Sequence, residues 1–137
     1  MNEQWEQWRP REGLAKRYNI RSITENSEGL VLLLSEEEID NRGLSISFGY
    51  TAGSYRSIDE TLCHMLILNL KEAYGAAFYT QWTFFIVKNS NYNKWLNEYS
   101  AEIGDYIGYT HFSLLTSELV VDVLATQPPT FSDVDLP

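Results

Sequence analysis

Residues Ser57–Tyr74 read SIDETLCHMLILNLKEAY, and this stretch decides the fold that the sequence predicts. Ser57 and Glu60 have the spacing of a capping box, in which each side chain accepts a hydrogen bond from the backbone N–H of the other residue. At about 100° per residue, most of the apolar side chains share one broad face of a helix. We therefore expect a single helix over the whole stretch, ended by Gly75 and laid across a β-sheet.

Strand patterns lie on both sides of this helix. Leu44–Tyr50 alternates apolar residues with serine and glycine, which is the period of a strand with one buried face. Ala77–Lys88 carries apolar residues in both alternating sets, so we expect a strand in the middle of the sheet. The valines of Leu119–Ala125 favour a strand over a helix. The predicted strands are 19–24, 30–34, 44–50, 77–88, 109–115 and 119–125.

A second helix is expected after residues Asn89–Asn91, which form a turn and its N-cap, because an apolar stripe with helical spacing follows. The element order is then β-β-β-α-β-α-β-β. This order lacks regular β-α-β alternation, which favours a mostly antiparallel sheet over a parallel one. The predicted fold class is therefore α+β, a single domain with a sheet of about five or six strands and two main helices packed on one face.

The chain length of 137 residues suits one domain with its own hydrophobic core. We expect residues 1–126 to form this α+β domain and residues 127–137 to form an irregular, acidic C-terminal tail. Residues 1–13 are predicted to be an N-terminal arm that docks two indoles onto the domain. Trp5 and Trp8 are three residues apart, so a helical turn ended by Pro10 would place them on one side.

The chain is strongly acidic, with a formal net charge of −9 and a pI near 4.6. Half of its 10 basic residues lie between Arg9 and Arg21. From Ser22 onward there are 16 acidic and 5 basic side chains. Such a charge repels phosphate backbones, so a nucleic acid is an unlikely partner, and it attracts basic proteins.

The composition also limits the kinds of site and location that we expect. Cys63 is the only cysteine, so no internal disulfide can form, and two histidines cannot complete a structural zinc site with it. No glycine-rich phosphate loop is present, and we expect no cofactor. No apolar run reaches the ~20 residues of a membrane span, and no signal-like leader is present, so a cytoplasmic protein is expected.

Three residues are candidates for a pocket between the predicted helix and the sheet, namely Arg56, Asp59 and His111. On a helix over residues 57–74, Asp59 falls within the apolar face, where a carboxylate is costly unless it is paired. Arg56 is its nearest candidate partner in the sequence. The alternative is that Asp59 only complements the helix dipole in the first turn, and that His111 is a structural residue of its strand.

No catalytic residue is predicted. Cys63 and His64 are neighbours on the expected helix and point about 100° apart, so they cannot form a thiolate–imidazole pair within it. His111 and Ser113 lie side by side along a strand, but neither an acidic partner nor a nucleophile elbow accompanies them in the sequence.

The segment from Tyr92 to Tyr109 combines aromatic and acidic residues, a composition that suits a protein-binding surface for a basic partner. The alternative is that the aromatic stripe packs the second helix onto the sheet. Both interpretations can hold, with Trp95 and Leu96 pointing inward and Tyr106 outward. The candidate binding residues are Tyr92, Trp95, Glu98, Tyr99, Glu102, Asp105 and Tyr106.

These features favour a small, acidic, cytosolic, non-enzymatic protein-binding domain. A bacterial immunity protein or an antitoxin that neutralises a basic toxin domain is of this type. One alternative is a small enzyme or ligand-binding domain with its pocket between the 57–74 helix and the sheet. Another is a homo-oligomeric structural protein, such as a homodimer, that uses an exposed strand edge or the arm that carries Trp5 and Trp8.

Overall fold

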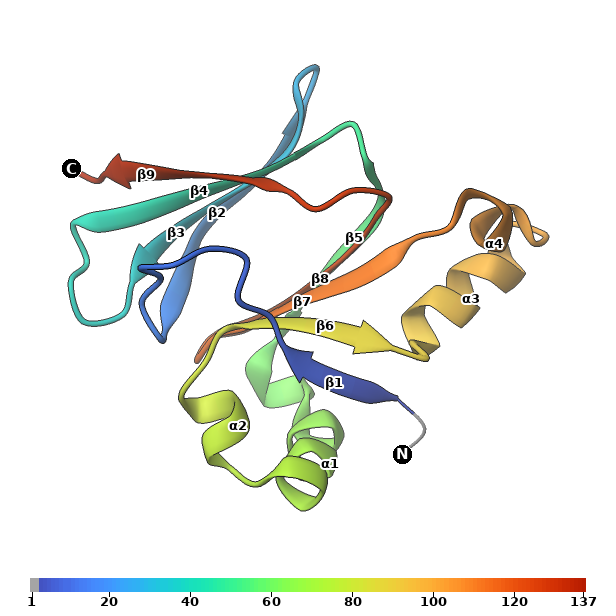
Figure 1. The fold of residues 1–137 in the computed structure, drawn as a ribbon, viewed down its shortest axis with the longest axis horizontal. Coiled ribbons are helices and arrows are strands. Elements are labelled where there is room, and N and C mark those ends of the chain that lie inside the picture. Colours follow the sequence, from blue (N-terminus) through green and yellow to red (C-terminus); the bar gives the residue numbers. More distant parts are fainter. Residues whose placement is uncertain (1–2) are drawn as a thin grey trace.

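Nine strands in two antiparallel sheets form the framework of residues 3–137, the part of the chain that the computed structural model describes (Figure 1). One sheet has the order β2 (Tyr18–Asn26), β3 (Gly29–Glu36), β4 (Arg42–Gly49) and β9 (Thr130–Asp135). The other has the order β1 (Gln4–Gln7), β6 (Phe84–Lys88), β7 (Thr110–Leu115), β8 (Leu119–Ala125) and β5 (Ala52–Asp59). The predicted α+β class is confirmed, whereas the predicted single sheet, its strand number and the element order are wrong.

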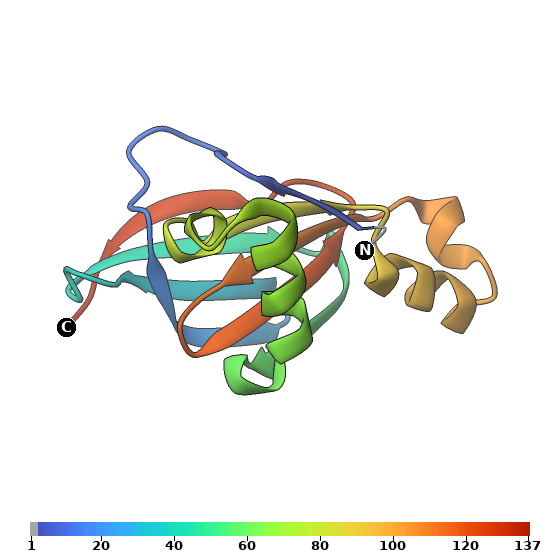
Figure 2. The same ribbon diagram turned by 90° about the horizontal axis from the view of Figure 1, so that it is seen from below.

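Helices cover one face of the five-stranded sheet and extend one of its ends. α1 (His64–Tyr74) and α2 (Ala77–Thr80) lie across the face that points away from the four-stranded sheet (Figure 2). α3 (Asn91–Tyr99) and α4 (Ile103–Ile107) follow β6 and project beyond the sheet. A single 3-10 turn, η1 (Glu60–Leu62), joins β5 to α1.

The two sheets pack through aromatic side chains at alternating strand positions. The ring centroid of Phe112 on β7 lies 5.6 Å from that of Phe48 on β4 and 5.0 Å from that of Trp8. Phe84 of β6 contacts Tyr18 of β2 in the same layer, with 5.4 Å between centroids. Because successive residues of a strand point to opposite faces, the central strands carry a second apolar set toward the helices. The four-stranded sheet and the helices thus cover opposite faces of the five-stranded sheet.

The predicted long helix is divided between two elements. Ser57 belongs to β5, where it pairs with Val121 of β8, and the helix begins only at His64. Asp59 caps the intervening turn, because its Oδ1 accepts a hydrogen bond of 3.0 Å from the backbone N–H of Thr61. The capping-box prediction is wrong because the ladder with β8 already satisfies the backbone groups of this segment.

The aromatic run after Gly75 is divided as well. Gly75 has a φ of 86° and ends α1, and the chain continues directly into α2. Phe78 of α2 stacks on Tyr74 of α1, with 4.3 Å between ring centroids, so its ring serves helix packing. The predicted strand Ala77–Lys88 is therefore correct only from Phe84 onward.

The N-terminal arm docks onto the domain, but as a strand. β1 pairs with β6 and places Trp5 opposite Val87. Residues three apart on a strand point to opposite faces, so Trp5 lies on the helix side while Trp8 enters the layer between the sheets. The prediction that both indoles share one side of a helical turn is wrong. Met1 and Asn2, the first residues of the predicted arm, lie outside the described residues.

The predicted irregular tail contains a strand. β9 extends the four-stranded sheet by pairing with β4, from Ser47 opposite Thr130 to Arg42 opposite Asp135. Phe131 packs between the sheets, with its ring centroid 5.7 Å from that of Trp8. The backbone ladder of β4, this ring and an ion pair between Arg11 and Asp133 hold a segment whose own sequence has few apolar residues.

We predict that Phe131→Ala lowers the free energy of unfolding by about 1–3 kcal/mol, less than for a fully buried phenylalanine because this ring is half-buried. Urea unfolding followed by tryptophan fluorescence measures the change. Ser132→Ala is the control, because Ser132 is exposed on the same strand, and it should change stability by less than about 0.5 kcal/mol. Equal effects of the two substitutions would contradict the packing of β9.

Candidate functional site

A cleft of about 810 Å³ opens on the outer face of the five-stranded sheet, between α1 and the start of α3. Residues of β5, β7 and β8 form its floor, and residues of β1 and the two helices form its walls. Ligand pockets commonly measure about 300–1,000 Å³, so the cleft is large enough for a small molecule.

A chain of hydrogen bonds runs through the floor of the cleft. Ser90 Oγ lies 2.6 Å from His111 Nδ1, and His111 Nε2 lies 2.7 Å from Asp122 Oδ1. The second carboxylate oxygen, Oδ2, accepts a hydrogen bond of 2.8 Å from Arg56 Nε. Ser90, His111 and Asp122 are buried, whereas Arg56 reaches solvent at the cleft. The chain of bonds therefore links a buried serine to a partly exposed cation.

Strand register brings three of these side chains together. Arg56 of β5 lies directly opposite Asp122 of β8 in the antiparallel ladder, so the two side chains share a face. Asp122 in turn lies opposite Ser113 of β7. His111 is two residues from Ser113 and points to the same face. The pairing of the central strands thus positions the charged floor of the cleft.

The N-cap of α3 determines which atoms of Ser90, His111 and Asp122 donate hydrogen bonds and which accept them. Ser90 Oγ accepts a hydrogen bond of 3.0 Å from the backbone N–H of Asn93, so its own O–H is left to donate to His111 Nδ1. His111 Nε2 then carries the ring proton and donates it to Asp122. The Ser90 hydroxyl thus both accepts and donates a hydrogen bond, whereas leaving it buried and unpaired would cost about 1–3 kcal/mol.

Asp122 is an ionised carboxylate at neutral pH. Burial by itself raises its pKa, but His111 and the Arg56 guanidinium lower it by more, so the pKa lies below its ordinary value. A buried charge of this kind is tolerated only while its partners stay in place. Arg56 and His111 are therefore required for Asp122 to occupy this position.

Arg56 is fixed by two contacts and keeps one edge unoccupied. Its Nε donates to Asp122, and its guanidinium carbon lies 4.1 Å from the centroid of the Tyr92 ring. The Tyr92 hydroxyl is hydrogen-bonded to Ser54 Oγ, which holds the ring in place. The Arg56 side chain is 45% exposed, and no acceptor among the described residues binds its Nη1 or Nη2.

Two of the three predicted pocket residues meet at this cleft. Arg56 and His111 are joined there through Asp122. Asp59 lies outside the cleft, exposed to solvent, and hydrogen bonds from Thr61 lower its pKa. It points away because residue 59 belongs to a strand, where alternation sends it to the opposite side from Arg56. No ion pair joins Arg56 to Asp59.

The sequence prediction missed Asp122 and the role of Ser90. Asp122 is the only charged residue in the valine-rich strand Leu119–Ala125. A lone carboxylate in a buried strand is rare unless it is paired, and this signal could have identified it. Ser90 is the N-cap of α3 within the predicted turn of residues 89–91, but the sequence gives no sign that its hydroxyl reaches His111.

Ser90, His111 and Asp122 are the residue types of a nucleophilic triad, but their arrangement does not expose a nucleophile. Ser90 does not line the cleft, and its Oγ already caps α3. Ser113 Oγ is buried without a hydrogen-bond partner among the described residues. Cys63 lines the cleft, but burial raises the pKa of its thiol, which stays protonated. The geometry fits a rigid binding floor better than covalent catalysis.

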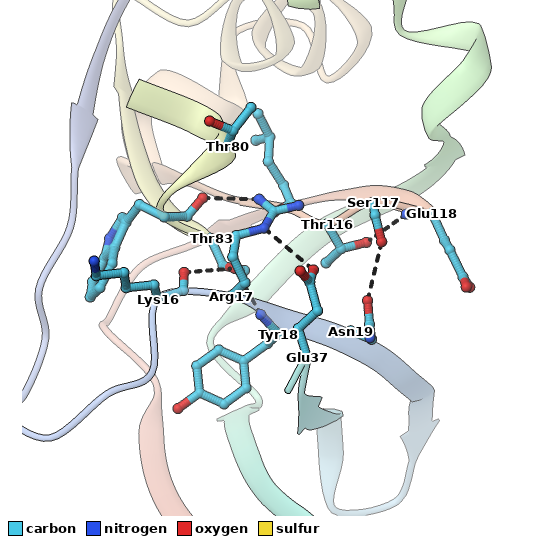
Figure 3. A network of polar contacts seen from close by, with 12 residues as sticks. Lys16, Arg17, Tyr18, Asn19, Glu37, Thr80, Thr83, Thr116, Ser117 and Glu118 are labelled. Atoms are coloured by element: carbon cyan, nitrogen blue, oxygen red, sulfur yellow. Dashed lines mark hydrogen bonds and ion pairs between the residues drawn. The ribbon is translucent and has the colours of Figure 1, made fainter. Parts of the chain in front are cut away.

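Arg17 provides a contrast to Arg56. Its Nη1 donates to three backbone carbonyls, at 2.8, 3.1 and 2.9 Å, from α2, the segment after α2 and the end of β7. Its Nε lies 3.6 Å from a carboxylate oxygen of Glu37 (Figure 3). Arg17 is therefore a structural clamp between segments. The hollow beside it measures about 320 Å³, less than half the volume of the cleft.

The candidate protein-binding residues lie on α3, on α4 and in the turn between them, at the projecting end of the molecule (Figure 1). Tyr92 is buried beneath Arg56, so the predicted packing of the stripe onto the sheet holds for this residue. Trp95 is 51% exposed and Tyr99 is 77% exposed, and their rings stack with 5.2 Å between centroids. Tyr106 is 92% exposed. The prediction that Trp95 points inward is therefore wrong, because about half of this side chain is exposed to solvent.

The two helices form one preformed surface. Ala101 and Glu102 both have positive φ, 52° and 72°, and turn the chain between α3 and α4. Asn97 Oδ1 then accepts a hydrogen bond of 2.9 Å from the backbone N–H of Asp105, which fixes α4 against α3. Glu98, Glu102 and Asp105 are exposed. The α3–α4 surface comprises Trp95, Glu98, Tyr99, Glu102, Asp105 and Tyr106.

Comparison of the chain with protein-family models, with curated proteins and with solved structures finds no match. Among residues 3–137, no helix combines the length and the apolar character that crossing a membrane would require. The geometry of the cleft and of the α3–α4 surface is therefore the basis on which a function can be proposed.

We predict that Asp122→Asn lowers the free energy of unfolding by about 3 kcal/mol at pH 7, because it removes a buried charge that Arg56 and His111 are placed to hold. The folded-state pKa of Asp122 is lowered, so its contribution is full above the unfolded-state pKa of about 3.9 and is lost as the pH falls through the folded-state value. The difference between wild type and variant should therefore shrink in acid.

Urea unfolding at pH 7 and at pH 3 measures this difference directly. Asp59→Asn is the control, because that carboxylate is exposed and its removal should have a far smaller effect. An Asp122→Asn effect of the same size at both pH values would show that Asp122 is not charged in the folded protein.

Proposed function

We propose that this chain is a non-enzymatic protein-binding domain that holds a basic protein partner on the α3–α4 surface. The observation that carries the proposal is the stacked, solvent-exposed pair of Trp95 and Tyr99, with Tyr106 nearby on α4. Contiguous exposed apolar surface is limited on monomeric proteins and often marks an interaction site. Tryptophan and tyrosine are also the residues most enriched at the energetic centres of protein interfaces.

The aromatic side chains are arranged before any partner arrives. The rings of Tyr92, Trp95 and Tyr99 follow one another along α3, with centroid distances of 5.9 and 5.2 Å. Tyr92 is buried at the base of this stack, so the two exposed rings rest on a fixed support. A rigid aromatic surface loses little conformational entropy on binding, which favours affinity.

The charges around these rings favour a basic partner. Glu98, Glu102 and Asp105 are exposed there, and Lys94 is the only basic residue of α3 and α4. Lysine or arginine side chains of a partner can pair with the carboxylates and stack on the rings. The net charge of −9 adds long-range attraction for a protein of opposite charge.

An immunity protein or antitoxin is the type of binding domain that we favour. Such a protein, in the bacterial cytoplasm, masks a basic toxin domain and needs no catalytic group of its own. The acidic composition supports this type, and the preformed α3–α4 surface provides a place for the contact. A homo-oligomeric structural role has less support, because Trp5 of the N-terminal arm is 4% exposed and packs within its own chain.

The test is affinity capture from an extract of the native host at low ionic strength, followed by mass spectrometry and by calorimetry with the purified partner. We expect a basic protein that high salt releases, because screening weakens contacts between exposed charges. Removing the exposed rings should weaken its binding by at least about tenfold. The ring variant is Trp95→Ser/Tyr99→Ser/Tyr106→Ser, and its control is Tyr50→Ser, at an exposed tyrosine in the turn between β4 and β5.

A second pair of variants separates local from overall charge. Both variants remove three exposed carboxylates and so change the net charge equally. The local variant is Glu98→Gln/Glu102→Gln/Asp105→Asn, and its control is Glu25→Gln/Glu28→Gln/Glu38→Gln. We expect only the local variant to lose affinity several-fold. Equal losses in both, or capture of no basic protein by the wild type, would refute the proposal.

A further inference from the structure

We propose that the cleft between α1 and α3 binds a small monocarboxylate with an apolar body, whose carboxylate pairs with the unoccupied edge of Arg56. This small-molecule site is additional to the partner-binding site proposed on the α3–α4 surface, and Trp95 belongs to both. The proposal depends on the lining of the cleft, on the fixed position of Arg56 and on the balance of charge around it.

Much of the cleft wall is apolar. Side chains from η1 and α1 form one side, Trp95 of α3 forms another, and two residues of β5 and β8 lie in the floor. The apolar lining residues are Ile58, Leu62, Met65, Leu66, Trp95 and Val120. Leu62 and Met65 are largely exposed to solvent. A ligand with an apolar body would cover them and gain the free energy of removing apolar surface from water.

Arg56 offers a preformed anion contact at this cleft. A guanidinium carries five N–H donors, and among the contacts of residues 3–137 only the Nε–H of Arg56 is bound, to Asp122. The contact with the Tyr92 ring and the bond to Asp122 hold the group at two points. Nη1 and Nη2 then present parallel N–H bonds, the geometry that matches the two oxygens of a carboxylate. The arginine is therefore oriented before a ligand arrives.

The surrounding charges select a monoanion. Asp122 already offsets part of the Arg56 charge, and Glu3 lines the same cleft. A dianion such as phosphate would meet these carboxylates and the net charge of −9, and the basic residues among the described lining of the cleft are Arg56 and the two histidines. A neutral acceptor would form weaker hydrogen bonds with the guanidinium edge than a carboxylate, and a cationic group would be repelled by it. A single carboxylate fits both constraints.

Trp5 lines the cleft on the opposite side of the sheet from Arg56. It comes from β1 and Arg56 from β5, the two edge strands of the five-stranded sheet. The Trp5 indole N–H is buried and has no hydrogen-bond partner among the described residues. Because residues of both edge strands line the cleft, it extends across the sheet from Trp5 to Arg56. A cleft that extends across the sheet suits an elongated ligand.

The experiment is a ¹H–¹⁵N NMR titration of the full chain with phenylacetate and hexanoate. Phenylacetamide and hexanamide are matched neutral probes, and inorganic phosphate tests the dianion. The indole signals of Trp5 and Trp95 report on the cleft, whereas Trp8 and Trp82 do not line it and serve as internal controls. We expect at least one carboxylate to bind with a dissociation constant on the order of 1 mM or tighter. Its amide should bind at least about tenfold more weakly.

Matched variants test the role of Arg56. Arg56→Gln should weaken carboxylate binding by at least about tenfold. Arg9→Gln is the control, because Arg9 also lies over an aromatic ring, 4.2 Å from the centroid of Trp82, but lies outside the cleft. If Arg56→Gln does not fold, Arg56→Lys retains the charge beside Asp122 but loses the planar fork, and it should also bind the carboxylate more weakly.

Each remaining outcome would overturn the proposal. These outcomes are no shift of the Trp5 or Trp95 signals by either carboxylate at about 10 mM, equal affinity for acids and amides, and tighter binding of phosphate. Unchanged affinity in the Arg56 variants would also overturn it, because the carboxylate would then bind elsewhere.

Discussion

The buried carboxylate of Asp122 is the constraint on which the outer face of the five-stranded sheet depends. It lies in a strand of valines, where an unpaired charge would cost several kcal/mol. The register between β5 and β8 places Arg56 directly opposite, and His111 contributes the second partner from β7. Ser90 extends the chain of bonds to the first turn of α3. One charge therefore couples the pairing of three strands to the position of a helix.

This coupling explains why a cleft and an exposed aromatic surface occur side by side. The inner face of the five-stranded sheet is covered by the four-stranded sheet, but its outer face has a polar floor that α1 leaves open. Tyr92 lies beneath Arg56 and begins the ring stack that continues through Trp95 to Tyr99. Trp95 lines the cleft and also belongs to the α3–α4 surface. A ligand at Arg56 and a partner on α3 and α4 would therefore contact the same indole.

The residue pattern of a single segment predicts those elements whose structure depends mainly on that segment. Leu44–Tyr50 alternates because its ladder has one buried face, and β4 covers nearly the same residues. Ser57 satisfied the local rule for a capping box, yet its backbone pairs with Val121, a residue far along the chain. β9 has few apolar residues of its own and takes its pairing from β4. Such long-range pairing overrides local propensity and cannot be read from one segment.

The difference between local pattern and long-range pairing also determines which residues of the site could be predicted. Arg56 is a candidate in the sequence only as a partner for Asp59. The sequence marks Asp122 as a lone carboxylate in a valine-rich strand, but its contacts with Arg56 and His111 are visible only once the strands are paired. Asp59 was placed inward by a helical wheel and faces outward on a strand. For the α3–α4 surface, the spacing of Trp95 indicated an amphipathic helix but not that α3 projects beyond the sheet.

The long-range ¹H–¹⁵N spectrum of the His111 imidazole tests the chain of hydrogen bonds most directly. We expect, at pH 7, a protonated Nε2 that donates to Asp122 and exchanges slowly with water, and an unprotonated Nδ1 that accepts from Ser90. His64 is exposed and provides the comparison in the same spectrum. An Nε2 without a proton, or a His111 ring that exchanges tautomers as rapidly as His64, would contradict the central role of Asp122.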